Sequence, residues 1–156
     1  MRVSVVVCEH SMDRYEDCRE AAESVLEQTH DDVELVLVSD GHEAVCSAFR
    51  SDYGDRDDVV IHCNEENVGL LRSRNNGAEA ATGDVVAFLD DDAVAEDTWV
   101  EELVHVYEKR RVPAVGGHVD PIWVVGEPRF LPEEFYFLVG ATHRGFAEGP
   151  GEVRNT

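Results

Sequence analysis

The chain has 156 residues, and its 34 Asp and Glu outnumber its 13 Lys and Arg, which gives a formal net charge of −21. Such an acidic surface repels nucleic acids and anionic membranes, while 43% hydrophobic residues in strand-like runs exclude a disordered chain. We interpret the charge as adaptation to concentrated salt, which screens self-repulsion; an acidic protein of ordinary salt is the alternative.

Strand-like and helix-like segments alternate along the first 117 residues. The first strand, Val3 to Cys8, is a β-branched run of the kind buried in a parallel sheet. A capping box of Asp13 and Glu16 predicts the start of the first helix, and Gly83 is the predicted C-cap of the third. In chain order we expect strands at 3–8, 33–39, 59–63, 84–89 and 112–117, and helices at about 13–28, 43–50, 69–82 and 97–109.

This alternation predicts an α/β fold, with a mostly parallel sheet flanked by helices and joined by right-handed crossovers. Beyond Gly117 the pattern dissolves into a stretch rich in proline and aromatic residues. We therefore expect a nucleotide-binding core at 1–117. Residues 118–156 then form the irregular start of an acceptor-side region that belongs to a longer, here truncated, protein.

The four cysteines are Cys8, Cys18, Cys46 and Cys63, and they form no CxxC pair. Cys8 and Cys63 end predicted strands, so we expect buried apolar side chains rather than bridges or metal ligands. The chain starts directly in strand residues, without a signal peptide, and no apolar run reaches the ~18 residues of a membrane helix. We expect a cytoplasmic location, at the cytoplasmic face of the cell membrane for a longer protein.

Three carboxylates, Asp90, Asp91 and Asp92, follow a predicted buried strand directly. Open α/β sheets bind ligands at the carboxyl ends of their strands, and adjacent carboxylates repel one another unless a cation is present. Such oxygen ligands can hold Mn²⁺ or Mg²⁺, which in turn grips a diphosphate. We assign Asp92 to the metal, Asp90 to a donor ribose and Asp91 to the same donor site; a solvated acidic turn is the alternative.

Two further acids follow strands at the same predicted edge. Asp40, before Gly41 at the end of the second strand, can accept the imide proton of a uracil; the alternative is an Asx-turn residue. Glu9 follows the first strand and is expected to line the base pocket, because strand ends on one edge converge; the alternative is a loop acid.

The segment from Asn67 to Gly77 opens a helix near the predicted diphosphate site. Gly69 permits close approach of a ligand to the helix N-terminus, which favours anions, and Asn67 belongs to the same turn. Arg72 and Arg74 can each pair with phosphate, but residues two apart on a helix point to different faces. We expect at most one of them to reach the ligand; solvated arginines are the alternative.

After residue 117 the candidate residues belong to the acceptor side. His118, with Asp120 and Trp123 nearby, is a candidate wall of an acceptor cleft, and a loop histidine beside a packing tryptophan is the alternative. His143 and Arg144 lie on a second candidate loop, where they are expected to bind a sugar carboxylate or an acceptor phosphate.

Taken in order, the motifs resemble the family 2 glycosyltransferases of the GT-A fold. The resemblance rests on five segments within residues 1–117: Val3-Ser4-Val5-Val6-Val7, Val38-Ser39-Asp40-Gly41, Asn67-Val68-Gly69 with Arg74-Asn75-Asn76-Gly77, Thr82-Gly83-Asp84 and Phe88-Leu89-Asp90-Asp91-Asp92. It implies a Rossmann-like GT-A core in which Asp40 binds the base, Glu9 lines its pocket, and the acid motif binds the ribose and a divalent metal. The implied chemistry is an inverting transfer from a UDP-sugar.

The later segments Ala114-Val115-Gly116-Gly117-His118-Val119, Phe130-Leu131-Pro132-Glu133-Glu134-Phe135-Tyr136 and Gly140-Ala141-Thr142-His143-Arg144-Gly145 are similar to haloarchaeal glycosyltransferases of protein N-glycosylation. Those include hexuronic acid transferases that act on sugar-charged dolichyl phosphate. The resemblance implies a lipid-linked saccharide as acceptor and a possible membrane association through a missing C-terminal part. It places the catalytic base beyond residue 156, so we name none.

Three other functions remain as alternatives. A sugar-phosphate nucleotidyltransferase would carry a Gly-rich, Lys-bearing loop after the first strand, where this chain has Cys8-Glu9-His10-Ser11-Met12. A phospho-receiver domain would have an acid pair at that position instead of Glu9 alone. A truncated, non-catalytic module that binds a nucleotide-sugar is the third.

Overall fold

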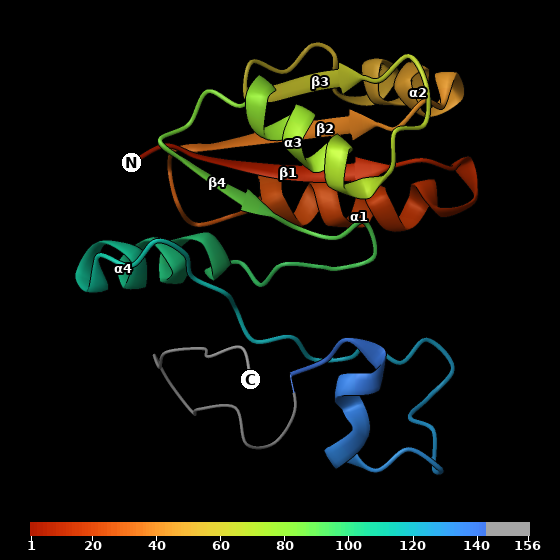
Figure 1. Ribbon diagram of the computed structural model, residues 1–156, viewed down its shortest axis with the longest axis vertical. Helices are drawn as coiled ribbons and strands as arrows, with labels where there is room; N and C mark the ends of the chain where they lie inside the picture. Colours follow the sequence, from red (N-terminus) through yellow and green to blue (C-terminus); the bar gives the residue numbers. More distant parts are fainter. Residues whose placement is uncertain (143–156) are drawn as a thin grey trace. The chain divides into compact units, whose positions relative to one another are not determined.

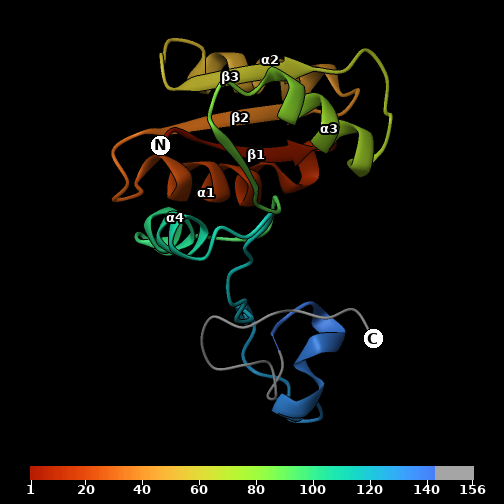
Figure 2. The same ribbon diagram turned by 60° about the vertical axis from the view of Figure 1, so that its left-hand side comes forward.

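The computed structural model describes residues 1–142 and contains a four-stranded parallel sheet in the order β3-β2-β1-β4 (Figures 1 and 2). All three strand pairs are parallel. The strands are β1 (Val3–Glu9), β2 (Val33–Ser39), β3 (Val59–Cys63) and β4 (Val85–Phe88), and the helices are α1 (Tyr15–Leu26), α2 (Glu43–Tyr53), α3 (Leu70–Ala80) and α4 (Trp99–Arg110), with 3₁₀ turns η1 (Met12–Arg14) and η2 (Glu133–Val139). This confirms the predicted α/β fold and its first four strands.

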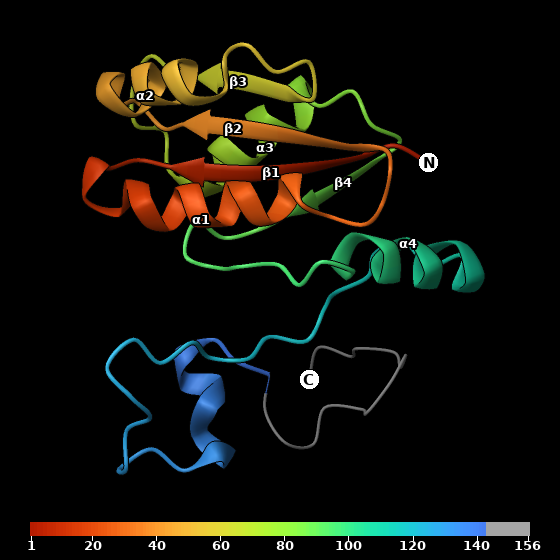
Figure 3. The ribbon, with the colours of Figure 1, turned by 180° about the vertical axis from the view of Figure 1, so that it is seen from behind.

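The sheet is covered on both faces, which explains why its central strands are unbroken apolar runs. Val5 and Val7 of β1 face α1 and α2, where Phe49 fills the core, and Figure 3 shows these two helices in front of the sheet. Val6 packs on the opposite face with Val36 and Val38. That face is covered by α3, which lies in front of the sheet in Figure 1.

Helix α3 lies very close to the sheet because Gly77 has no side chain. A Cβ atom at Gly77 would lie 2.5 Å from Cγ1 of Val6 and 2.9 Å from Cγ2 of Val38. The close approach brings the first turn of α3 down to the ends of β1 and β2. Gly77 therefore helps to position the candidate site.

Several local predictions were wrong. The N-cap is Ser11 and not the predicted capping box of Asp13 and Glu16. Oγ of Ser11 accepts a hydrogen bond from the backbone N–H of Asp13 at 3.1 Å. Helix α3 ends at Ala80, and Gly83 instead packs against Ser4, whose Oγ would lie 2.6 Å from a Cβ there. Residues 112–117 form no strand, because no strand of the described sheet pairs with them.

The expectation about cysteine was also wrong for one pair. Cys46 in α2 and Cys63 at the end of β3 form a disulfide, with Cα atoms 5.9 Å apart. Cys8 and Cys18 are free; Cys8, which was expected to be buried, is half-buried, and Cys18 is buried. The bridge joins the outer helix α2 to the strand at one end of the sheet order.

The chain divides into two compact units, with the boundary between Val104 and His105. In the second unit, Trp123 packs edge-on against Tyr136 at 5.5 Å between ring centroids, and Thr142 N–H donates to the carbonyl of Val119. Among residues 1–142, no helix is long and apolar enough to cross a membrane. The sequence-based boundary at residue 117 stays a prediction.

A buried carboxylate ties together the end of the sheet opposite the acid loop. Glu34 in β2 is 1% exposed; it accepts hydrogen bonds from Ser4 Oγ at 2.6 Å and from the N–H and hydroxyl of Thr82 at 2.8 and 2.5 Å, and Arg2 pairs with it at 3.0 Å. Burial opposes its ionisation, but these donors outweigh burial and lower the pKa of Glu34. The ionised form therefore stabilises the fold.

We predict that Glu34→Gln lowers the free energy of unfolding by about 1–3 kcal/mol at neutral pH, because the donors lose a charged acceptor. Since the folded-state pKa of Glu34 lies below its ordinary value of 4.5, its contribution is complete above that value. It is lost as the pH falls through the folded-state pKa. Urea unfolding from pH 7 to pH 3 should show the difference from the unsubstituted protein shrinking with acid. The exposed Glu79→Gln serves as control, and an equal, pH-independent effect of both variants would contradict the prediction.

For the disulfide, we predict that denatured but unreduced protein takes up two alkyl groups, at Cys8 and Cys18, and four after reduction. Cys46→Ser should take up three without reduction, because Cys63 becomes free. The cross-link closes a loop with a sequence separation of 17, and loops of roughly that size contribute about 3 kcal/mol. Mass spectrometry and denaturant unfolding with and without a reductant test both points; four alkylated cysteines before reduction would refute the bridge.

Candidate functional site

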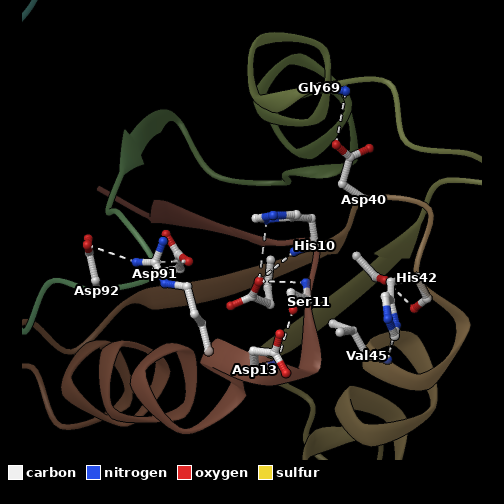
Figure 4. Close-up of polar contacts among 12 residues, drawn as sticks. His10, Ser11, Asp13, Asp40, His42, Val45, Gly69, Asp91 and Asp92 are labelled. Atoms are coloured by element: carbon white, nitrogen blue, oxygen red, sulfur yellow. Dashed lines mark hydrogen bonds and ion pairs between the residues drawn. The ribbon is translucent and has the colours of Figure 1, made fainter.

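The candidate site lies at the carboxyl edge of the sheet, where β1 is flanked by β2 and β4. Glu9 ends β1, Asp40 follows β2, and the acid loop, defined as Asp90 to Asp92, follows β4. Because all the strands are parallel, their carboxyl ends meet at this one edge. The structure therefore brings together the acids that the sequence placed in one site (Figure 4).

A cleft of about 280 Å³ opens at this edge. It is lined by Cys8, Glu9, His10, Asp40, Asn67, Gly69, Leu70 and Ser73. Burial raises the pKa of the Cys8 thiol to about 12, so this side chain is a neutral wall. The ends of β1 and β2 thus form one side of the cleft, and the turn before α3 forms the other.

Asp40 is the best-satisfied carboxylate of the cleft and is 5% exposed. Its Oδ1 accepts from Val68 N–H at 2.8 Å and from Asn64 Nδ2 at 3.0 Å. Its Oδ2 accepts from Gly69 N–H at 3.0 Å, the bond drawn in Figure 4. Burial acts to raise its pKa, but these donors, together with Ser73, outweigh burial and lower it. Asp40 is therefore an ionised acceptor that also shapes the turn before α3.

Glu9 is buried and only half satisfied. Its Oε1 accepts from the backbone N–H groups of His10 at 2.6 Å and Ser11 at 2.8 Å. Its Oε2 has no hydrogen-bond partner among the described residues. Because an unsatisfied buried acceptor costs free energy, this oxygen can accept a donor from a ligand or from water.

Two arginines neutralise the acid loop from opposite elements. Arg74 of α3 pairs with Asp90, whereas one nitrogen of Arg14, in η1, lies 3.4 Å from Oδ2 of Asp91 and 2.8 Å from Oδ2 of Asp92. Burial is the main cause of the raised pKa of Asp91; Arg14 opposes the rise and the charge of Glu9 adds to it. Asp91 and Asp92 thus converge on a single cationic nitrogen (Figure 4).

Arg72 and Arg74 lie in different surroundings, and the expectation that at most one of them reaches a ligand stays a prediction. Arg74 is half-buried, pairs with the acid loop and lies 5.8 Å above the ring of Phe88. Arg72 is exposed, and no hydrogen bond or ion pair links it to the acid loop. Arg74 is therefore the arginine of α3 that reaches the edge of the sheet.

Of the residues expected on the acceptor side, His118 belongs to the second unit, where it is exposed and lies 3.2 Å from Asp120. His143 and Arg144 fall outside the described residues. These three assignments stay predictions.

Sequence reasoning missed two polar residues that organise the site, Arg14 and Asn64. Arg14 sits in a 3₁₀ turn that the sequence suggested was the first turn of a helix. Asn64 belongs to no motif, and its side chain donates to Asp40 across 24 residues of sequence. Arg14 and Asn64 can be recognised as site residues only from their positions next to the strand ends in three dimensions.

Chemically, the edge combines an ionised acceptor in a cleft after β2 with a charged loop after β4, and β1 lies between these two strands. Asp40 suits a ligand N–H, the turn at Gly69 presents the N-terminus of an 11-residue helix to anions, and the acid loop suits a cation. A nucleoside diphosphate with a divalent cation offers these three features together.

Comparison with solved structures agrees with this architecture. TarS of S. aureus in complex with UDP superposes with a TM-score of 0.68 at 19% sequence identity, covering 83% of this chain and 38% of that one. The likeness shows the fold, which is the GT-A fold of glycosyltransferases.

The family follows from the sequence. The model of Glycosyl transferase family 2 matches residues 4–153, and the chain belongs to this family. Membership confirms the predicted family and favours sugar transfer over the nucleotidyltransferase and phospho-receiver alternatives.

Two relatives illustrate the similarity of this chain to other glycosyltransferases. A glucosyl-dolichyl phosphate glucuronosyltransferase of Haloferax volcanii is 57% identical over the full length of this chain and half of its own. An uncharacterized glycosyltransferase of Nostoc is 34% identical over 78% of this chain and 38% of its own length. The chain thus spans half or less of the length of these curated relatives.

Proposed function

We propose that this chain is the donor-binding part of a glycosyltransferase that moves a hexuronic acid from a UDP-sugar to a dolichyl phosphate-linked saccharide in protein N-glycosylation. The observation that carries the proposal is the 57% identity to the Haloferax glucuronosyltransferase along the whole chain. The cleft at Asp40 and the acid loop are the two structural features that support it.

In this proposal each part of the edge has one task. Asp40 accepts the imide N–H of the uracil, and Glu9 offers its unpartnered Oε2 to a donor of the same ligand. The turn at Asn67 and Gly69 lies against the diphosphate, where backbone N–H groups favour anions. Asp90 accepts from the ribose, which requires Arg74 to turn from Asp90 toward a phosphate.

The family resemblance implies a divalent metal, and the acid loop fits one in a limited way. No three His, Cys, Asp or Glu side chains among residues 1–142 form a ready-made metal cluster. However, oxygens of Asp91 and Asp92 already converge on a cation, the guanidinium of Arg14. We propose that Asp92 and Asp91 would hold Mn²⁺ or Mg²⁺, which when bound stabilises the charge on the nucleoside diphosphate leaving group.

We further propose that the transfer inverts the configuration at the anomeric carbon. An acceptor hydroxyl attacks that carbon on the face opposite the diphosphate as a base removes its proton. No base is assigned to the described residues. A chain that binds donor without transferring sugar, while a longer protein does both, would instead be a non-catalytic donor-binding module.

We predict that UDP binds this chain in concentrated KCl and that Mn²⁺ strengthens the binding. Asp92→Ala should remove the effect of Mn²⁺, because the loop loses its outer carboxylate. Isothermal titration of UDP with and without Mn²⁺ measures both. The control is Asp57→Ala, which removes an exposed acid far from the cleft. No UDP binding by folded, unsubstituted protein would overturn the proposed donor, and an unchanged Mn²⁺ effect in Asp92→Ala would overturn the metal assignment alone.

We also predict that Arg14→Gln tightens the binding of Mn²⁺ alone, because the ion no longer competes with a guanidinium for Asp91 and Asp92. The expected gain is about twofold to fivefold, as for a partly exposed pair worth up to about 1 kcal/mol. Electron paramagnetic resonance of free Mn²⁺ measures it without any nucleotide. Arg56→Gln breaks the comparable pair with Asp58 outside the site, and an equal gain in that control would show a general charge effect.

A further inference from the structure

Asn64, the residue directly after β3, is the hydrogen-bonding centre of the turn beside Asp40. Its Nδ2 donates to Oδ1 of Asp40 at 3.0 Å and to Oγ of Ser73 at 2.9 Å. Its Oδ1 accepts from Nδ2 of Asn76 at 2.7 Å and lies 3.1 Å from Nε2 of His62. An amide has two N–H donors and two acceptor lone pairs, so all four are used and the orientation of the group is fixed.

The two carboxylate oxygens of Asp40 have different hydrogen-bond partners. Oδ1 accepts from both Asn64 and Val68 N–H, which fills its two lone pairs. Oδ2 accepts from Gly69 N–H, and the Ser73 side chain also hydrogen-bonds to this carboxylate. Because Gly69 lines the cleft together with Asp40, Oδ2 is the oxygen of Asp40 that is held on the cleft side.

The backbone of Asn64 strengthens this arrangement. Its N–H donates to the carbonyl of Ser39, the residue before Asp40, at 2.9 Å. Side chain and backbone thus connect the ends of β2 and β3 with the first two turns of α3. A displacement of the Asn64 amide would release Oδ1 of Asp40 and the turn at once.

We propose that Asn64 is a positioning residue that sets the base preference of the cleft, because it occupies one oxygen of Asp40 and leaves the other to receive a ring N–H. Such an acceptor selects a base with a ring N–H, as in uracil, over one with a ring-nitrogen acceptor in the same place, as in cytosine. This inference rests on the proposed binding of a nucleoside diphosphate.

Asn64→Asp separates this role from simple packing, since the two side chains have nearly the same shape. The change replaces the N–H donor facing Asp40 with a second carboxylate oxygen. Two carboxylates at hydrogen-bond distance share a proton that lies between them, so Asp40 becomes a weaker acceptor toward the ligand. The bond from the ring N–H of uracil is weakened, whereas cytosine has no ring N–H to donate there and loses no such bond.

The experiment titrates UDP, CDP and inorganic pyrophosphate into the unsubstituted protein and into Asn64→Asp, with Mn²⁺ in concentrated KCl. We expect a preference for UDP over CDP in the unsubstituted protein. Asn64→Asp should weaken UDP by about tenfold or more, the equivalent of 1.4 kcal/mol, and should reduce the ratio of UDP to CDP affinity. The affinity for pyrophosphate should stay unchanged. The exposed Asn75→Asp, the same chemical change on α3, should leave all three affinities unchanged.

An unchanged ratio of UDP to CDP affinity in Asn64→Asp, or an equal loss for UDP and pyrophosphate, would overturn the inference while leaving the proposed function in place. Failure of the unsubstituted protein to bind UDP would overturn both. If Asn64→Asp does not fold, Asn76→Ala replaces it, because it frees Oδ1 of Asn64 without adding charge. It should lower UDP affinity by a smaller factor in the same base-selective way, and equal UDP and CDP losses would again refute the inference.

Discussion

Carboxylates that gather at one edge of a sheet repel one another, and the arrangement of this molecule follows from how each one is compensated. Backbone N–H groups of His10 and Ser11 face Glu9, the turn before α3 closes on Asp40, and two arginines face the acid loop. The compensating groups come from the loop after β1, from η1, from the turn before α3 and from α3 itself. Helix α3 and the short segments beside the strand ends therefore supply the positive charge and the donors that the edge requires.

The elements that the sequence predicted well are those whose burial alone decides their structure. The β-branched runs of β1 and β2 are buried on both faces, so their pattern left no alternative to a parallel strand. The failed strand at 112–117 contains Pro113 and two adjacent glycines, Gly116 and Gly117, and proline and glycine disfavour sheet pairing. Apolar character without a pairing partner was not sufficient to form a strand.

For the site, sequence reasoning succeeded with residues that follow strands and failed with their partners. Asp40, Glu9 and the acid loop could be placed because a parallel sheet brings its strand ends to one edge. Arg14 and Asn64 could not, because the carboxylates that they bind in the site lie 24 or more residues away and no fixed spacing links them. The same reason hid the disulfide between Cys46 and Cys63, since only the packing of α2 beside β3 brings those two cysteines together.

The position of that disulfide has a consequence for partial unfolding. In the described sheet, β3 is an edge strand with only β2 as a neighbour, and its five residues are all half-buried, so a sub-global opening can detach it. Cys63 is the last residue of β3 and directly precedes Asn64, while Cys46 lies in the first turn of α2, just after the turn at Asp40. A detached β3 would stay tethered within reach of the turn that it must rejoin, at the high effective concentration of a short covalent link. After such an opening, the cleft can close again by a short movement of the tethered β3 segment, without the refolding of a free edge strand.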